Sequence, residues 1–135
     1  MTDFPIVIFH NPACGTSRNT VAMVKAAGYA PTVVEYLKAG WTREQLLDLA
    51  ARSGLTVREL LRDKGTPAEE LGLLDAAVSD DAILKAMIEH PILVNRPLVV
   101  TPKGVALARP SEKVLDLLEN LPESFTKEDG EVVKL

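Results

Sequence analysis

Cys14 is the single cysteine of the chain and the residue from which covalent chemistry is expected. It follows the apolar run at residues 6–9 and precedes a stretch of helical spacing, which predicts a strand-to-helix turn around it. A thiol is reactive as the thiolate, and the N–H groups and dipole of a helix N-terminus stabilise that charge. The same amides can hold an oxyanion. A buried, inert cysteine is the alternative, but the neighbouring Pro12, Gly15 and Thr16 favour a reactive turn.

Ser17 stands where a dithiol redox motif would have its second cysteine. The chain therefore has no internal thiol that could resolve an oxidised Cys14. The electrons that regenerate Cys14 must come from another molecule, such as glutathione or a small thiol protein. Ser17 itself is expected to donate a hydrogen bond to the thiolate and help to keep it charged.

His10 lies four residues before the cysteine, and two interpretations of it stay open. Its imidazole could sustain the ionisation of the thiol, or it could cap the end of the first strand through a backbone hydrogen bond. A metal site built from His10, Cys14 and His90 is not expected, because these residues lack paired ligand spacing.

The anion-binding loop of a phosphatase would need an arginine six positions after the cysteine. That position is Thr20, and Arg18 is nearby but in the wrong place. An oxyanion bound at Cys14 would therefore need arginines from distant parts of the chain to balance its charge.

The elements that must position these side chains begin with a βαβ unit. A strand at residues 6–9, a helix ending near Gly28 and a strand at residues 32–36 predict a parallel pair with a right-handed crossover.

A helical segment follows, between about residues 42 and 90. Its predicted helix starts are capping boxes and an acidic N-terminus, and they are Thr42 with Gln45, Thr56 with Glu59, Thr66 with Pro67 and Glu69, and Ser79 with Asp80 and Asp81.

The end of the chain predicts two more strands and a helix. Residues 98–101 and 105–108, separated by Pro102-Lys103-Gly104, indicate an antiparallel hairpin. A helix with one apolar face should follow over residues 110–118, and the charged tail from about Pro122 is expected to be loosely held. The order βαβ, helical insertion, ββα is that of an α/β, three-layer thioredoxin-like fold, which we expect to form a single domain over residues 1–135.

Composition limits the possible partners. The net charge of −4 and pI near 5.2 argue against nucleic-acid binding, which relies on a basic stripe. No run is long and apolar enough for a membrane span. One cysteine cannot form an internal disulfide, so the cytoplasm is the expected compartment, and a monomer is the expected state.

Several longer motifs occur in order along the chain. They are His10-Asn11-Pro12-Ala13-Cys14-Gly15-Thr16-Ser17-Arg18-Asn19-Thr20, Val57-Arg58-Glu59-Leu60-Leu61-Arg62, His90-Pro91-Ile92-Leu93-Val94-Asn95-Arg96-Pro97, Val99-Val100-Thr101-Pro102 and Arg109-Pro110-Ser111-Glu112. Together they resemble the motifs of the glutaredoxin-coupled arsenate reductases, and the resemblance runs from about residue 6 to residue 130.

The resemblance implies an enzyme that reduces arsenate to arsenite. Cys14 would be the nucleophile, and Arg62, Arg96 and Arg109 would bind the oxyanion. Taken singly, each arginine is expected to be a surface charge or to pack its stem against a helix, and it is the joint match of the three that favours an anion site. Glutathione would be the co-substrate and glutaredoxin the protein partner, with no tightly bound cofactor. Thioredoxin-like folds also carry a cis-proline facing the active cysteine, which predicts a cis Arg96-Pro97 bond.

Two other functions are compatible with the same fold. One is a glutathione-dependent reductase of mixed disulfides. The other is a redox-sensing regulator that binds the transcription machinery, although such sensors often use a cysteine pair and Ser17 replaces the second cysteine here.

Overall fold

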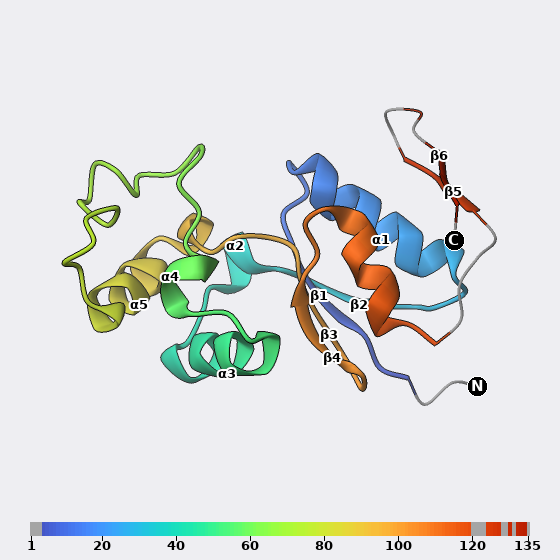
Figure 1. The fold of residues 1–135 in the computed structure, drawn as a ribbon, viewed down its shortest axis with the longest axis horizontal. Coiled ribbons are helices and arrows are strands. Elements are labelled where there is room, and N and C mark those ends of the chain that lie inside the picture. The colour runs from blue at the N-terminus through green and yellow to red at the C-terminus, as the bar shows by residue number, and fades with distance from the viewer. Residues whose placement is uncertain (1–3, 120–123, 128–129, 131, 135) are drawn as a thin grey trace. The chain divides into compact units, whose positions relative to one another are not determined.

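The computed structural model describes residues 4–119, 124–127, 130 and 132–134. The chain divides into two compact units (Figure 1). One, the sheet unit, consists of Met1–Glu35 and Arg96–Leu135, and the other, the helical unit, is Tyr36–Asn95. The helical unit is thus inserted into the sequence of the sheet unit, where the sequence predicted a helical segment.

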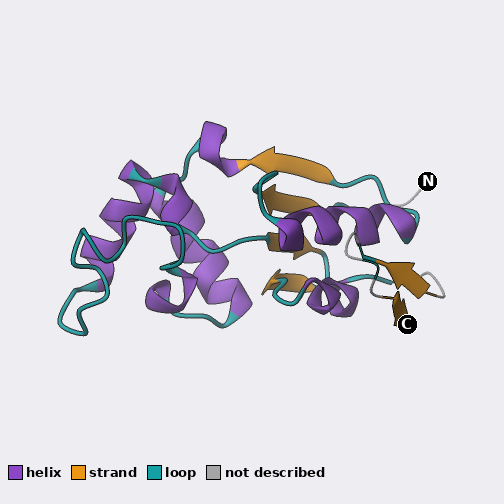
Figure 2. Ribbon diagram, turned by 90° about the horizontal axis from the view of Figure 1, so that it is seen from above, coloured by secondary structure: helices purple, strands orange, loops and turns teal. Residues whose placement is uncertain are grey.

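The sheet unit is built on a four-stranded sheet in the order β2-β1-β3-β4 (Figure 2). β1 and β2 are parallel, whereas β1 with β3 and β3 with β4 are antiparallel. This order confirms the predicted βαβ unit followed by a hairpin. The strands are β1 (Val7–His10), β2 (Thr32–Glu35), β3 (Leu98–Thr101) and β4 (Gly104–Leu107).

Two helices pack against one face of this sheet. α1 (Gly15–Ala26) connects β1 to β2, and η2 (Ser111–Leu117) follows β4. They lie side by side in Figure 1, and the core between them and the sheet is made by buried apolar residues. These include Ile8, Met23, Val24, Val99, Val114, Leu117 and Leu118.

The last helix differs from the α-helix that the sequence favoured. η2 is a 3-10 helix, with bonds such as Lys113 N–H to the Pro110 carbonyl, three residues back. The predicted apolar face is nevertheless confirmed, because Val114, Leu117 and Leu118 are all buried.

The C-terminal tail predicted to be loosely held lies partly outside the described residues. Within the described ones, β5 (Ser124–Thr126) and β6 (Val132–Lys134) pair as an antiparallel hairpin that the sequence did not predict. The ammonium of Lys127 lies 2.6 Å from the carboxylate of Glu112 on η2. The tail contains residues with high strand propensity among its charged residues, and these account for the pairing. The prediction missed it because it considered only the charges of the tail.

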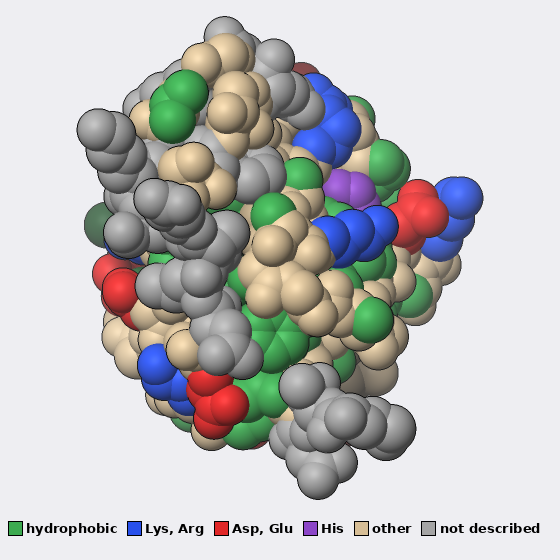
Figure 3. All heavy atoms as spheres, turned by 90° about the vertical axis from the view of Figure 1, so that its right-hand side faces the viewer, with side chains coloured by type: hydrophobic (Ala, Val, Ile, Leu, Met, Phe, Trp, Pro, Cys, Tyr) green, Lys and Arg blue, Asp and Glu red, His purple; other side chains and the backbone are tan. Residues whose placement is uncertain are grey.

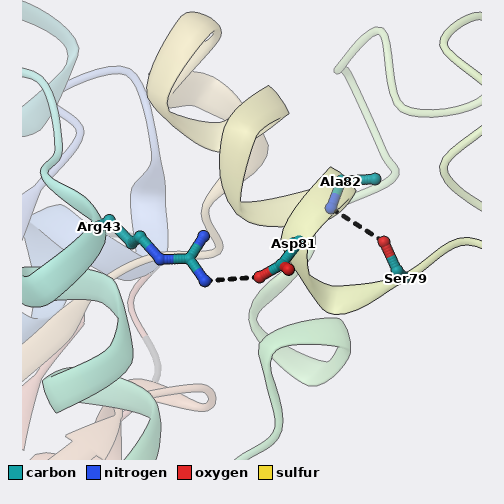
Figure 4. Close-up of polar contacts among 4 residues, drawn as sticks. All are labelled: Arg43, Ser79, Asp81 and Ala82. Atoms are coloured by element: carbon teal, nitrogen blue, oxygen red, sulfur yellow. Dashed lines mark hydrogen bonds and ion pairs between the residues drawn. The ribbon is translucent and has the colours of Figure 1, made fainter.

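The helical unit contains α2 (Tyr36–Ala39), α3 (Arg43–Ser53), α4 (Val57–Leu60), α5 (Asp80–Glu89) and the 3-10 helix η1 (Pro91–Leu93). Both capping boxes that start with Thr42 and Thr56 are confirmed. The hydroxyl of Ser79 accepts the Ala82 N–H at 3.2 Å, and Arg43 of α3 pairs with Asp81 of α5 (Figure 4).

The predicted helix start at Thr66 is wrong. Residues 64–77 form turns rather than a helix. The Thr66 hydroxyl donates backwards to the carbonyls of Arg62 and Asp63, and Gly72 has a φ of +73°, which interrupts a right-handed helix.

None of the helices in the described part of the chain has the length and apolar character needed to cross a lipid bilayer. On the face shown in Figure 3, basic side chains are interspersed with acidic, apolar and uncharged ones, without a continuous basic stripe among the residues drawn in colour.

Candidate active site

The turn between β1 and α1 presents Cys14 at the start of the helix, as predicted. Cys14 is the N-cap residue, with extended backbone (φ −99°, ψ 121°). Its N–H donates to the carbonyl of Asn11 at 3.0 Å. Asn11 and Pro12 are residues that initiate tight turns, which explains why the chain bends here directly after the strand.

Three groups donate hydrogen bonds to the sulfur of Cys14, which is buried. They are the backbone N–H of Ser17 and the guanidiniums of Arg96 and Arg109; Arg109 Nη1 lies 3.6 Å from Sγ. Burial by itself raises the pKa of the thiol, but the hydrogen bonds from Arg96, Ser17 and Arg109 and the charge of Arg96 outweigh it. The pKa falls from the ordinary 9.0 to about 6, so Cys14 is mainly thiolate at neutral pH.

In the sequence, the two arginines follow the helical insertion, whereas Cys14 precedes it. Arg96 lies two residues before β3, and Arg109 lies two residues after β4. Arg109 Nη1 also donates to the Arg96 carbonyl at 3.0 Å, which ties the two segments together beside the sulfur. The Arg96-Pro97 bond is cis, which confirms the prediction, and Arg109-Pro110 is a second cis bond that the sequence did not predict.

Ser17 is completely buried in the first turn of α1. The hydrogen bond expected from Ser17 to the thiolate comes from its backbone N–H. Its hydroxyl oxygen lies 3.4 Å from the backbone nitrogen of Asn11 and accepts that N–H. Ser17 therefore connects the helix both to the sulfur and to the turn that precedes it.

His10 ends β1, and burial lowers its pKa. Glu35 opposes this effect, while Arg18 and Lys25 lower the pKa further, so the imidazole is neutral at pH 7. Nδ1 is buried and makes no hydrogen bond within the described residues. The backbone cap considered for His10 is therefore not made through this nitrogen, and a role in ionising the thiol stays a prediction.

Arg62 belongs to the helical unit, and its surroundings there are well defined. Its Nε donates to the Lys64 carbonyl at 3.2 Å, and Nη1 to the Asn95 side-chain oxygen at 3.4 Å. Its backbone N–H donates to the Leu93 carbonyl at 2.7 Å. The structure thus brings Arg96 and Arg109 onto Cys14, and the participation of Arg62 stays a prediction.

The donor set of this site suits an oxyanion better than a metal ion. Two guanidiniums, always charged and with planar donor forks, flank a thiolate at a helix N-terminus. Within the described residues no group of three or more His, Cys, Asp or Glu side chains could hold a metal. The arrangement can bind a tetrahedral anion and attack its central atom with sulfur.

Two residues of the turn were not singled out from the sequence. Asn11 is buried, and its side-chain oxygen accepts the Ala13 N–H at 2.9 Å. Arg18 donates to the Pro12 carbonyl at 2.8 Å. The Asn11-Pro12 pair is a turn signal that could have indicated Asn11, whereas the contact of Arg18 depends on the conformation of the folded turn.

Comparison with known proteins identifies relatives over nearly the whole chain. Residues 9–117 match the ArsC family. "Arsenate reductase ArsI1" of Synechocystis sp. is 59% identical over 134 residues, which cover 98% of this chain and 93% of that protein. "Arsenate reductase" of Rhizobium meliloti is 58% identical over 129 residues, covering 95% of this chain and 92% of that protein.

A solved structure, "Arsenate reductase from Vibrio cholerae", superposes with a TM-score of 0.82 at 42% sequence identity. The match covers 87% of this chain and all of that one. The similarity therefore extends to the three-dimensional arrangement as well as to the sequence.

Proposed function

Because the chain belongs to the ArsC family, we propose that it is an arsenate reductase that converts arsenate to arsenite with Cys14 as the nucleophile. The observation that carries the proposal is the Cys14 sulfur, which accepts hydrogen bonds from Arg96 and Arg109 and has a pKa of about 6. The relatives named above as arsenate reductases support the choice of substrate.

In the first step the thiolate attacks arsenic. An S–As bond forms, and one As–O bond breaks as that oxygen takes up protons and leaves as water. Arg96 and Arg109 offset the charge of the remaining oxygens, and Arg62 supplies a third guanidinium to the same anion. Arsenic stays pentavalent in this step, so no electrons have yet been transferred.

The reducing equivalents come from outside, because the chain has no second cysteine. Glutathione binds arsenic through its sulfur and displaces a second oxygen as water. A glutaredoxin thiolate then attacks the glutathione sulfur, so that an S–S bond forms and the electron pair of the As–S bond stays on arsenic, which becomes trivalent. Water finally hydrolyses the bond between Cys14 and arsenic, which releases arsenite and regenerates the thiol.

The proposed enzyme is a single catalytic domain over residues 1–135, with Cys14 in the sheet unit and Arg62 in the helical unit. No tightly bound cofactor is required. Reduced glutathione and glutaredoxin are thiols of the cytoplasm, where we place the enzyme, working as a monomer.

A coupled assay tests this function. Purified chain, glutathione, glutaredoxin, glutathione reductase and NADPH are mixed, and arsenate-dependent oxidation of NADPH is followed for the wild type and for Cys14→Ser. We expect turnover in the wild type and none in Cys14→Ser. Wild-type rates in Cys14→Ser would refute the proposed nucleophile.

The coupled assay, together with a pull-down, separates the other two functions from arsenate reduction. Reduction of glutathione mixed disulfides without arsenate-dependent turnover would identify a thiol-disulfide reductase instead. Binding to RNA polymerase in a pull-down, with no turnover of either substrate, would identify a regulator. Either outcome would replace the arsenate reductase proposal.

A further inference from the structure

We propose that Asn11 is a positioning residue for Cys14: its neutral side-chain amide holds the turn that presents the sulfur to α1 and adds no charge there. The inference rests on the proposed function, in which the Cys14 thiolate is the nucleophile. It assigns a role to a residue that does not itself contact the sulfur.

Asn11 holds the turn between β1 and α1 through two hydrogen bonds. Asn11 directly follows β1 and is 4% exposed. Its side-chain oxygen accepts the Ala13 N–H at 2.9 Å, and its backbone carbonyl accepts the Cys14 N–H at 3.0 Å. One residue therefore satisfies two successive amides, and this fixes the direction in which the chain enters α1.

Asn11 also connects this turn to Ser17, whose backbone N–H donates to the thiolate. The backbone N–H of Asn11 donates to the Ser17 hydroxyl at 3.4 Å. The backbone N–H of Ser17 is in turn one of the groups that bond to the Cys14 sulfur. Asn11 therefore fixes the position of Cys14 relative to the Ser17 amide. The exposed Arg18 stabilises the same turn by donating a hydrogen bond to the Pro12 carbonyl.

The side-chain amide of Asn11 also differs from a carboxylate in carrying no charge. Aspartate could accept the Ala13 N–H equally well, since Asn and Asp form the same local turns. A buried carboxylate three residues from a thiolate would, however, oppose ionisation of the thiol. Alanine is neutral but has no acceptor. Among these three side chains, asparagine alone provides the acceptor without the charge.

The charged groups already present around the site are not altered by substitution of Asn11. Arg96 and Arg109 face the sulfur, and Glu35, Arg18 and Lys25 act on the neighbouring His10. A change in Cys14 ionisation on substitution of Asn11 would therefore come from the turn or from the introduced charge.

The experiment measures the rate of Cys14 alkylation by iodoacetamide against pH in the full-length chain. Asn11→Ala should raise the pKa of Cys14 by about one or more, because the Ser17 amide loses its alignment with the sulfur. Asn11→Asp should raise it as well, through the introduced charge, because the turn itself is retained. Asn11→Ser, whose hydroxyl accepts more weakly, should fall between the wild type and Asn11→Ala.

Thr101→Val is the matched control for destabilisation. It removes the buried hydrogen bond from the Thr101 hydroxyl to the Leu117 carbonyl in the same unit, so it should lower the melting temperature and leave the pKa of Cys14 at about 6. If Asn11→Ala does not fold, Asn11→Ser carries the test of the turn.

A pKa that stays at about 6 in Asn11→Ser and in Asn11→Ala would overturn the proposal. An unchanged pKa in Asn11→Asp would overturn its charge component. Alkylation reports on the thiol whether or not the chain reduces arsenate, so this result is independent of the proposed function. In the coupled assay the same variants should lower kcat at neutral pH and leave KM for arsenate nearly unchanged, because no anion contact is lost.

Discussion

The low pKa of Cys14 arises from competition between burial and donated hydrogen bonds. Burial would by itself keep the thiol protonated, and it is the largest single influence on its pKa. Two guanidiniums and one helix amide together outweigh it. A residue buried like a core cysteine can therefore be reactive, because the groups that bury it also donate to it.

Replacing one guanidinium tests this competition. Arg96→Gln keeps a donor but removes the charge, so the pKa of Cys14 should rise from about 6 toward 9.0. Alkylation by iodoacetamide at neutral pH should slow by roughly tenfold as the thiolate fraction falls. A pH–rate profile measures the change.

Arg52→Gln is the control for this measurement, because Arg52 is an exposed arginine of α3 that pairs with Asp48. Its profile should match that of the wild type. An unchanged profile in Arg96→Gln would mean that Arg96 does not sustain the thiolate.

The sequence revealed the position of the thiol but not its whole surroundings. Cys14 at a strand-to-helix turn followed from local pattern, because the apolar run and the turn residues are adjacent. Arg96 and Arg109 were indicated through the resemblance, since their approach to the sulfur depends on how distant strands pair. Asn11 was missed because its role depends on hydrogen bonds that only the folded turn displays.

Among the helices and strands, predictions based on contacts between near neighbours were the most successful. Thr42, Thr56 and Ser79 cap helices as expected, because a capping contact spans only three residues. Thr66 has the same pattern and its hydroxyl accepts the Ala68 N–H at 3.2 Å, but it also donates to earlier carbonyls and no helix follows. The competing acceptors could not be read from the spacing alone.

The cap of α4 provides a stability prediction. Thr56→Ala removes the acceptor for the Glu59 N–H and should lower the free energy of unfolding by about 1 kcal/mol. Thr56→Ser keeps the acceptor and should lose much less. Urea denaturation measures both, and equal losses in the two variants would contradict the capping role.

The ion pair between Lys127 and Glu112 predicts a pH-dependent contribution to stability. The hydrogen bond from Lys127 holds the pKa of Glu112 below its ordinary 4.5. The contribution is therefore complete above that value and is lost as the pH falls through the lowered pKa.

Glu112→Gln should reduce the free energy of unfolding by up to about 1 kcal/mol at neutral pH, because the pair is only partly buried. As the pH falls through the lowered pKa of Glu112, the difference from the wild type should disappear. Denaturation over a range of pH measures it, and a difference that grows on acidification would contradict the pair.

At the scale of the whole molecule, the three arginines proposed to bind the oxyanion come from different parts of the chain. Arg62 belongs to Tyr36–Asn95, whereas Arg96 and Arg109 belong to the sheet unit. The division into units could not be read from the sequence beyond the change from alternating elements to helices alone. If Arg62 has its proposed role, arsenate should protect the backbone amides around Arg62 as well as those around Cys14.

Hydrogen exchange with and without arsenate tests this coupling. In the wild type, arsenate should slow exchange around Arg62 as well as around Cys14. In Arg62→Ala only the sheet unit should respond, and arsenate turnover should weaken by about 2–4 kcal/mol of transition-state stabilisation. Protection of the helical unit that persists in Arg62→Ala would contradict the role of Arg62.

The insertion of the helical unit also determines when the enzyme becomes reactive during its synthesis. Met1–Glu35 leaves the ribosome with Cys14 in place, but the 60 residues of Tyr36–Asn95 must be translated before Arg96 appears, and Arg109 follows later still. At about 5–20 residues per second this is an interval of several seconds. During that time the nascent chain carries Cys14 without its guanidinium donors. Its thiol is therefore less ionised than in the folded chain and reacts more slowly with oxidants.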